Sequence, residues 1–128
     1  MLLSSPRIAL TPAEALDVIY DWAMELAPEE ACGIIVNLPK DGFQLYHLAN
    51  EATDPTGGYR ISPESLGEVI ESEQVWKDSV TIWHTHPGGL VGPSEGDLEN
   101  MMEGCRYMVV TLPSLEVTYF GAMPIFRR

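Results

Sequence analysis

Residues 83–97 read WHTHPGGLVGPSEGD, and this stretch determines how the rest of the sequence is interpreted. It contains His84 and His86, two of the three histidines in the chain. The apolar run that leads into it, residues 80–83, predicts a strand. Residues two apart on a strand point to the same face, so the two imidazoles are expected to point at one place.

A carboxylate follows at the far end of the stretch. Asp97 lies in the first turn of an expected helix, after a loop, residues 88–92, that contains three glycines. That loop is long enough to fold the turn back over the histidines. Zinc binds neutral imidazole and carboxylate groups, and a catalytic zinc has three protein ligands and a water molecule. We therefore expect His84, His86 and Asp97 to bind Zn2+, with water in the fourth position.

A plainer interpretation stays open from these residues alone. Ser94 and Asp97 have the spacing of a helix N-cap followed by an acid in the first turn, which is common without any metal. This interpretation does not explain two histidines at strand spacing in a chain with only three. His47 has no partner in the sequence, and we interpret it as structural or exposed, because a lone histidine is weak support for a site.

Two earlier helices begin with clear signals. Residues 11–14, Thr-Pro-Ala-Glu, form a capping box with proline in the first turn and predict a helix that ends near Ala27. The buried face expected for it is Leu16, Ile19, Tyr20, Ala23, Met24 and Ala27. Residues 62–64, Ser-Pro-Glu, repeat this pattern for a helix to about residue 75, with a buried stripe of Leu66, Val69 and Ile70. The third helix is expected from residue 93 to about residue 103.

The remaining elements are strands and loops. Strands are expected at residues 31–38, 43–48, 80–84, 107–112 and 115–120. Residues 33–36, Gly-Ile-Ile-Val, are apolar without alternation, which is typical of a strand buried on both faces. Helices alternate with strands in the middle of the chain, and hairpins stand at both sides. The pattern predicts a mixed sheet with helices packed on it, in one compact α/β domain over residues 1–128.

Composition excludes several classes of partner. The net charge is −12, from 19 acidic and 7 basic residues, so binding to nucleic-acid phosphates is not expected. No apolar run approaches the roughly 20 residues needed to cross a membrane, and the first ten residues do not resemble a signal peptide. A cytoplasmic location is expected. Cys32 and Cys105 form no CxxC pair; one disulfide or a reduced compartment would fit equally, and we expect two small buried residues.

At this point the residues match a known family. Residues 84–87 and 94–97, separated by six residues, read HxHP-x6-SxxD. This resembles the motif of the JAMM, or MPN/Mov34, metalloprotease domain. The family pattern also has an upstream glutamate followed by a small residue, a glycine and an apolar strand. Residues 28–36, PEEACGIIV, match it with Glu30 in the catalytic position, and the resemblance spans essentially the whole chain.

The resemblance implies a fold and a chemistry. The fold would be a cytidine-deaminase-like α/β/α sandwich with a mixed central sheet, and the activity would be hydrolysis of amide bonds, often isopeptide bonds. His84, His86 and Asp97 would hold the zinc, Glu30 would act as general acid/base on the bound water, and Ser94 would hydrogen-bond to the tetrahedral intermediate. Without the family, Glu30 would be interpreted as an exposed acid after a helix.

The sequence is most similar to the minimal prokaryotic and phage members of the family. It lacks the insertions with which eukaryotic members clamp ubiquitin, and residues 59–63 are similar to the phage tail-assembly members. Those members often continue into an NlpC/P60 cysteine-peptidase domain. No such domain stands in this sequence, which implies a separate partner or a member of another kind. If the protein is phage-encoded, the expected location is the host cytoplasm.

Three functions follow as hypotheses. The first is a zinc metallopeptidase or isopeptidase that acts on a protein or peptide, such as a phage tail protein. The second is processing of a ubiquitin-like sulfur-carrier protein at its tail. The third is a noncatalytic, structural module in phage tail assembly. Inactive family members usually lose metal ligands and every motif residue is present here, so we favour catalysis. The oligomeric state stays open.

Overall fold

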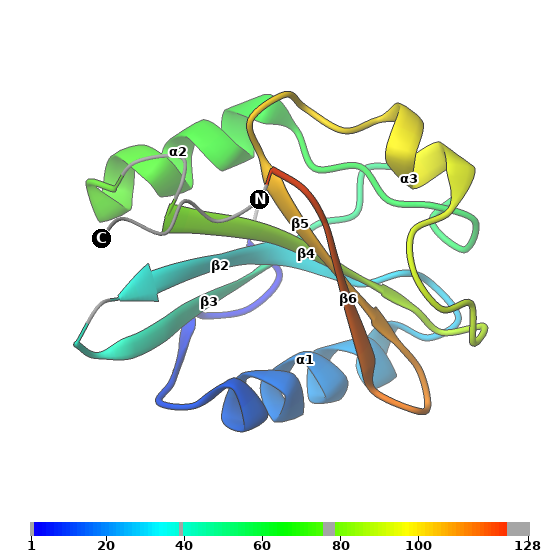
Figure 1. The fold of residues 1–128 in the computed structure, drawn as a ribbon, viewed down its shortest axis with the longest axis horizontal. Helices are drawn as coiled ribbons and strands as arrows, with labels where there is room; N and C mark the ends of the chain where they lie inside the picture. The colour runs from blue at the N-terminus through cyan, green and yellow to red at the C-terminus, as the bar shows by residue number, and fades with distance from the viewer. Residues whose placement is uncertain (1, 39, 76–78, 123–128) are drawn as a thin grey trace.

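The computed structural model of the protein describes residues 2–38, 40–75 and 79–122. In chain order the elements are β1 (Arg7–Ala9), α1 (Pro12–Leu26), β2 (Cys32–Leu38), β3 (Gly42–Leu48), α2 (Pro63–Glu73), β4 (Val80–His86), α3 (Glu95–Glu99), β5 (Arg106–Thr111) and β6 (Glu116–Gly121). Figure 1 shows α1 on one face of the sheet and α2 and α3 on the other. The predicted α/β/α sandwich is confirmed.

The sheet is mixed and has β2 and β4 at its centre. Its six strands lie in the order β1-β3-β2-β4-β5-β6, and only the β4–β5 pair among them is parallel. β2 and β4 are antiparallel, with Cys32 opposite His84. The start of β2 therefore lies beside the end of β4. This register brings Glu30, just before β2, close to the two histidines.

Helix α1 begins as predicted and buries part of the predicted face, with Ile19 and Ala23 buried and Leu16 and Tyr20 partly buried. Thr11 Oγ1 accepts a hydrogen bond from the Glu14 amide. The buried residues are Ala15, Val18, Ile19, Trp22 and Ala23. The predicted burial of Met24 and Ala27 is wrong, because both are exposed. The largest apolar group, Trp22, decides the rotation of the helix, because it stacks on Trp83 of the sheet with ring centroids 6.0 Å apart.

Two other expectations need correction. Helix α3 ends at Glu99 rather than near residue 103. Its Leu98 is 47% exposed, so the helix has no buried apolar face at this end that would stabilise further turns. Helix α2 ends at Glu73, two residues early, where Gln74 takes a left-handed conformation. The edge strand β1 was not predicted at all, and it exists through its pairing with β3.

The two cores fill both faces of the sheet. The α1 side contains Trp22 and Trp83, and the α2 side contains Cys32 and Cys105, which are buried and free as expected for small core residues. His47 stacks on Trp22 at 5.0 Å and is only 2% exposed, so its structural interpretation is confirmed and the exposed one is wrong. Among the described residues, no helix is long and apolar enough to span a bilayer.

Candidate metal centre

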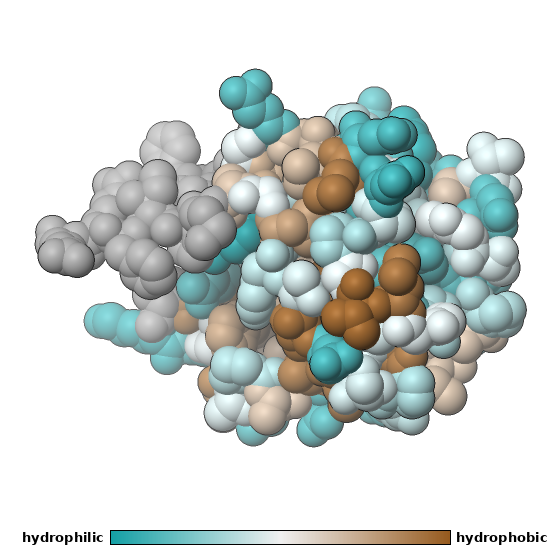
Figure 2. Space-filling model, turned by 45° about the vertical axis from the view of Figure 1, so that its right-hand side comes forward, coloured by the Kyte–Doolittle hydropathy of each residue, from teal (hydrophilic) through white to brown (hydrophobic). Residues whose placement is uncertain are grey.

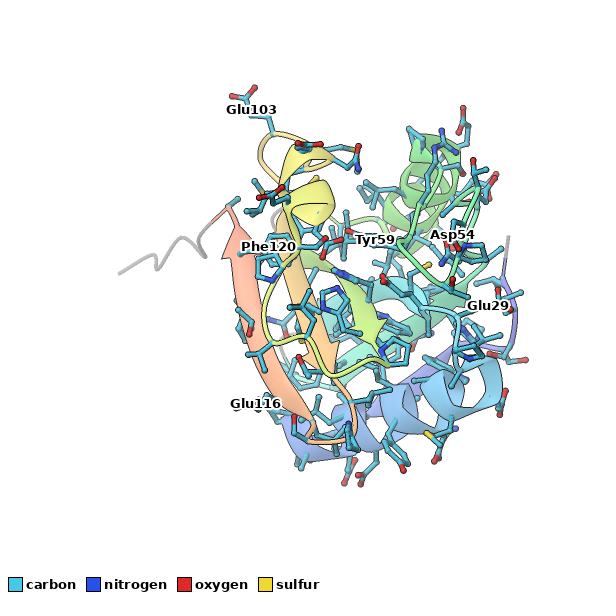
Figure 3. All side chains as sticks on the ribbon, turned by 90° about the vertical axis from the view of Figure 1, so that its right-hand side faces the viewer. Glu29, Asp54, Tyr59, Glu103, Glu116 and Phe120 are labelled. Atoms are coloured by element: carbon cyan, nitrogen blue, oxygen red, sulfur yellow. The ribbon has the colours of Figure 1, made fainter. Side chains whose placement is uncertain are left out.

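Four buried side chains from three separate segments meet at one end of the sheet. His84 and His86 come from the end of β4, Asp97 from the first turn of α3, and Glu30 from the residues just before β2. One ligand atom from each lies within 4.8 Å of all the others. Every residue in this cluster is at most 7% exposed. Figure 3 labels Tyr59 and Phe120, whose rings both lie against the His84 ring.

Three of these atoms form a small triangle. His84 Nε2 lies 3.0 Å from Asp97 Oδ2, His86 Nε2 lies 3.1 Å from the same oxygen, and the two Nε2 atoms are 3.1 Å apart. A proton on an imidazole nitrogen can bridge such a contact, and a metal cation can take its place when the imidazoles are neutral. Zinc bonds of roughly 2.0–2.2 Å place neighbouring tetrahedral ligand atoms about 3.3 Å apart, so the triangle needs only a slight expansion to fit zinc.

Asp97, which could hold a metal, also takes part in the capping box of α3, whose N-cap is Ser94. The Ser94 amide donates to Asp97 Oδ2 at 2.9 Å, and the Asp97 amide donates to Ser94 Oγ at 3.1 Å. This capping box holds the Asp97 carboxylate in one orientation. The plainer interpretation of these two residues is therefore correct and also compatible with a metal. The Ser94 hydroxyl accepts a bond here and keeps its own proton to donate.

The two histidines keep the Asp97 carboxylate ionised. Burial lowers the pKa of His84 below its usual value, and Asp97 opposes this only in part. Burial also lowers the pKa of His86, but bonds to Asp97 and to the Leu90 carbonyl outweigh it and raise the pKa. Burial raises the pKa of Asp97, but hydrogen bonds from both histidines hold it well below its usual range. The carboxylate therefore stays ionised, as metal binding requires.

The loop after β4 orients His86. Its Nδ1 lies 3.1 Å from the Leu90 carbonyl, which also accepts a bond from Thr111 Oγ1 at 2.8 Å. A carbonyl only accepts, so Nδ1 carries a proton, and in the neutral imidazole Nε2 then presents its lone pair to the centre. His84 is held differently, by its ring: Tyr59 stacks on it with centroids 4.0 Å apart and Phe120 meets it edge-on at 6.3 Å.

Glu30, which the sequence pattern places in the catalytic position, is buried, and its neighbour Glu29 is exposed (Figure 3). The Oε1 atom of Glu30 is buried without a hydrogen-bond partner among the described residues. Burial raises the pKa of Glu30 to about 7, with His86 opposing the shift. A carboxyl group in this state can exchange a proton near neutral pH.

Sequence reasoning missed the residues that hold Glu30 and His84. Thr85 is turned away from the two histidines; its Oγ1 accepts a bond from the Ala31 amide at 3.0 Å, and its own amide donates to the Ala31 carbonyl. Its position between the two histidines was the available signal. Tyr59 lies in residues 59–63, whose similarity to phage tail-assembly members gave no signal of a contact with His84.

Comparison with known proteins places this site in a family. Residues 12–121 match the family described as prokaryotic homologs of the JAB domain. The chain belongs to this family. The match begins in α1 and ends in β6, so the JAB domain includes all four clustered residues. The fold and the His/His/Asp/Glu cluster are together compatible with zinc binding.

A phage protein is also similar to this JAB domain. The Tail tip assembly protein K of Escherichia phage N15 is 29% identical over 85 residues. The aligned part is 66% of this chain but only 32% of the phage protein. The match thus covers about a third of the length of this relative.

Proposed function

We propose that this JAB domain is a zinc-dependent hydrolase that cleaves an amide bond in a protein or peptide. The convergence of His84 Nε2, His86 Nε2 and Asp97 Oδ2 within 3.1 Å, beside a buried and unpartnered Glu30 oxygen, carries this proposal. A structural carboxylate would be paired, and a structural zinc site would be closed by a fourth strong ligand. Here the fourth group is an acid suited to proton transfer.

The residues divide into two roles. His84, His86 and Asp97 would hold the zinc, which when bound lowers the pKa of water to about 7 and polarises a carbonyl. Glu30 takes a proton from the attacking water and delivers it to the leaving amine. Its burial favours both steps, because a carboxylate with a pKa near 7 can accept and return a proton at neutral pH.

Ser94 has the third role. Its hydroxyl proton is not used in the helix cap, since Oγ only accepts from the Asp97 amide. We assign this proton to the oxyanion of the tetrahedral intermediate. One such donor contributes about 2.7–4 kcal/mol to transition-state stabilisation in a comparable hydrolase.

Exposed apolar side chains beside the centre favour a polypeptide substrate. They lie in the segment that carries His86 and Asp97: Leu90, Val91, Leu98 and Met101. Figure 2 shows hydrophobic side chains gathered on this side of the molecule. Exposed apolar patches rimmed by polar groups are typical of surfaces that bind proteins or peptides.

The test compares zinc-loaded wild type with Glu30→Gln. Both are incubated with a peptide library and with isopeptide-linked peptide pairs, and new termini are identified by mass spectrometry. Wild type should generate new termini, whereas Glu30→Gln should bind one zinc per chain and generate none. Equal cleavage by Glu30→Gln, or no cleavage of any substrate by zinc-loaded wild type, would disprove the proposal.

A second candidate is a role in phage tail assembly. The similarity to a phage tail tip assembly protein favours it. The substrate is then a tail protein, or the domain is a noncatalytic part of the assembly. A phage that carries Glu30→Gln in this gene separates the two. Loss of plaques with normal protein levels supports cleavage, and normal plaques support the noncatalytic role.

A further inference from the structure

Glu30 has no strand partner of its own, because it precedes β2. Its backbone is instead bonded to the segment 50–60. The Glu30 amide donates to the Pro55 carbonyl at 2.8 Å, and the Glu30 carbonyl accepts from Asn50 Nδ2 at 3.0 Å. Both backbone polar groups of the proposed acid/base thus depend on a segment outside the sheet.

Asn50 organises that segment. Its Nδ2 also donates to the Gly58 carbonyl at 2.9 Å, and its Oδ1 accepts from the amides of Ala52 and Arg60 at 3.0 and 3.1 Å. The side-chain amide faces carbonyls on one side and N–H groups on the other, so only this orientation satisfies it. One side chain therefore closes the 50–60 segment and fastens it to Glu30.

The same segment reaches the other side of the centre. Tyr59 lies next to Gly58 and stacks on the His84 imidazole with an interplanar angle of 18°. Figure 3 labels Tyr59 and Asp54, which both belong to this segment. The segment thus contacts both the proposed acid/base and a proposed zinc ligand.

We propose that Asn50 is a positioning residue for the hydrolytic reaction: it fixes the 50–60 segment so that the Glu30 carboxyl is held beside His84, His86 and Asp97. This inference rests on the proposed function. Asn50 acts through Glu30 and contacts none of the three proposed metal ligands. Its loss should therefore lower kcat and leave zinc binding and KM nearly unchanged.

The test uses Asn50→Ala, Asn50→Asp and a control, Val18→Ala. Val18 is buried on the α1 side of the sheet, so its truncation destabilises the fold away from the segment. Asn50→Asp keeps the oxygen that accepts from Ala52 and Arg60 but removes the donor to Glu30. A misplacement of about 1 Å costs on the order of 100-fold in rate, so both Asn50 variants should lose about that factor in kcat, with KM within about threefold.

Two readouts separate positioning from general destabilisation. Hydrogen exchange of the Glu30 amide should accelerate roughly tenfold in both Asn50 variants, the equivalent of about one hydrogen bond, and stay unchanged in Val18→Ala. The zinc affinity of both Asn50 variants should equal that of wild type, because Asn50 makes no hydrogen bond to the three proposed metal ligands.

The outcomes are distinct. Unchanged exchange at Glu30 in a folded Asn50 variant, or an equal loss of kcat in Val18→Ala, overturns the proposal. If Asn50→Ala does not fold, Asn50→Asp decides with the same measurements. If zinc-loaded wild type cleaves nothing, the proposed function fails and with it the catalytic role of Asn50; the exchange of the Glu30 amide still reports whether Asn50 holds that segment.

Discussion

At the residue scale, Asp97 and Ser94 each have two roles, one in the cap of α3 and one in the candidate metal centre. Asp97 Oδ2 closes the cap of α3 and lies between the two histidines. Ser94 Oγ accepts the reciprocal bond and keeps a proton to donate. Because the cap holds the carboxylate in place before any metal arrives, little rearrangement is needed on binding.

Ser94→Ala should separate the cap from the chemistry. Loss of the cap should lower the free energy of unfolding by about 1 kcal/mol. Loss of the oxyanion donor should lower kcat by about 100- to 1,000-fold, with zinc binding unchanged. Ser62→Ala is the matched control, because Ser62 caps α2 through the same kind of bond, to the Ser65 amide. Comparable stability losses with equal kcat in the two variants would refute the role of Ser94.

His47 predicts a dependence of stability on pH. Burial lowers its pKa from 6.5 to about 4 in the folded protein, so the unfolded chain binds a proton more readily. Stability is therefore lost as the pH falls below about 6.5, by on the order of 1–3 kcal/mol at pH 4. His47→Phe keeps a ring against Trp22 and cannot titrate. Urea unfolding of both metal-free proteins from pH 7 to pH 4 should show the loss of stability due to His47 in wild type alone. An equal fall in the free energy of unfolding of wild type and His47→Phe over this pH range would contradict the role of His47.

At the element scale, β4 and the start of β2 act as one unit. Thr85 bonds Ala31 through both its amide and its hydroxyl, which fixes the chain directly after Glu30. The side chain is fully buried, so the Ala31 amide has no water to replace that bond. The distance between the acid and the histidines thus depends on a residue that faces away from them.

Thr85→Val should test this link. The substitution keeps the shape and leaves the Ala31 amide buried without a partner, which costs about 1–3 kcal/mol. Thr81→Val on the same strand is the control, because Thr81 is half-buried and its substitution should change stability by about 0.5 kcal/mol or less. Thermal unfolding of both variants gives the comparison. Equal stability of the two variants would argue against the Thr85–Ala31 bond.

The sequence could predict elements where the signal is local. The starts of α1 and α2 follow from caps within four residues, and the HxH spacing follows from strand geometry. The face that α1 buries depends on the stacking of Trp22 on Trp83 in the core. The end of α3 depends on whether another segment packs on Leu98 and buries it. The roles of Asn50 and Tyr59 depend on contacts between distant segments. Such facts are set by tertiary packing and leave no local pattern.

At the scale of the whole molecule, the centre ties together three segments that are far apart in sequence. Glu30 precedes β2, the histidines end β4, and Asp97 begins α3. A ligand that binds only the folded state stabilises it by mass action. Metal binding here should therefore be coupled to the stability of the fold.

Removal of metal should lower the stability of the whole domain. With free zinc at about 100 times its dissociation constant, the stabilisation is about 2.7 kcal/mol. A chelator should therefore lower the Tm of wild type, and added zinc should restore it. His84→Ala should show no shift with either reagent. A wild-type Tm that is insensitive to both would contradict the coupling.

The central claim is that His84, His86 and Asp97 bind one zinc ion, with Glu30 beside it. Anomalous diffraction at the zinc edge, from crystals grown with zinc, tests it most directly. We predict one peak per chain at roughly 2.0–2.2 Å from His84 Nε2, His86 Nε2 and Asp97 Oδ2. A zinc-soaked crystal with no peak at this position, or with its zinc bound elsewhere, would contradict the claim.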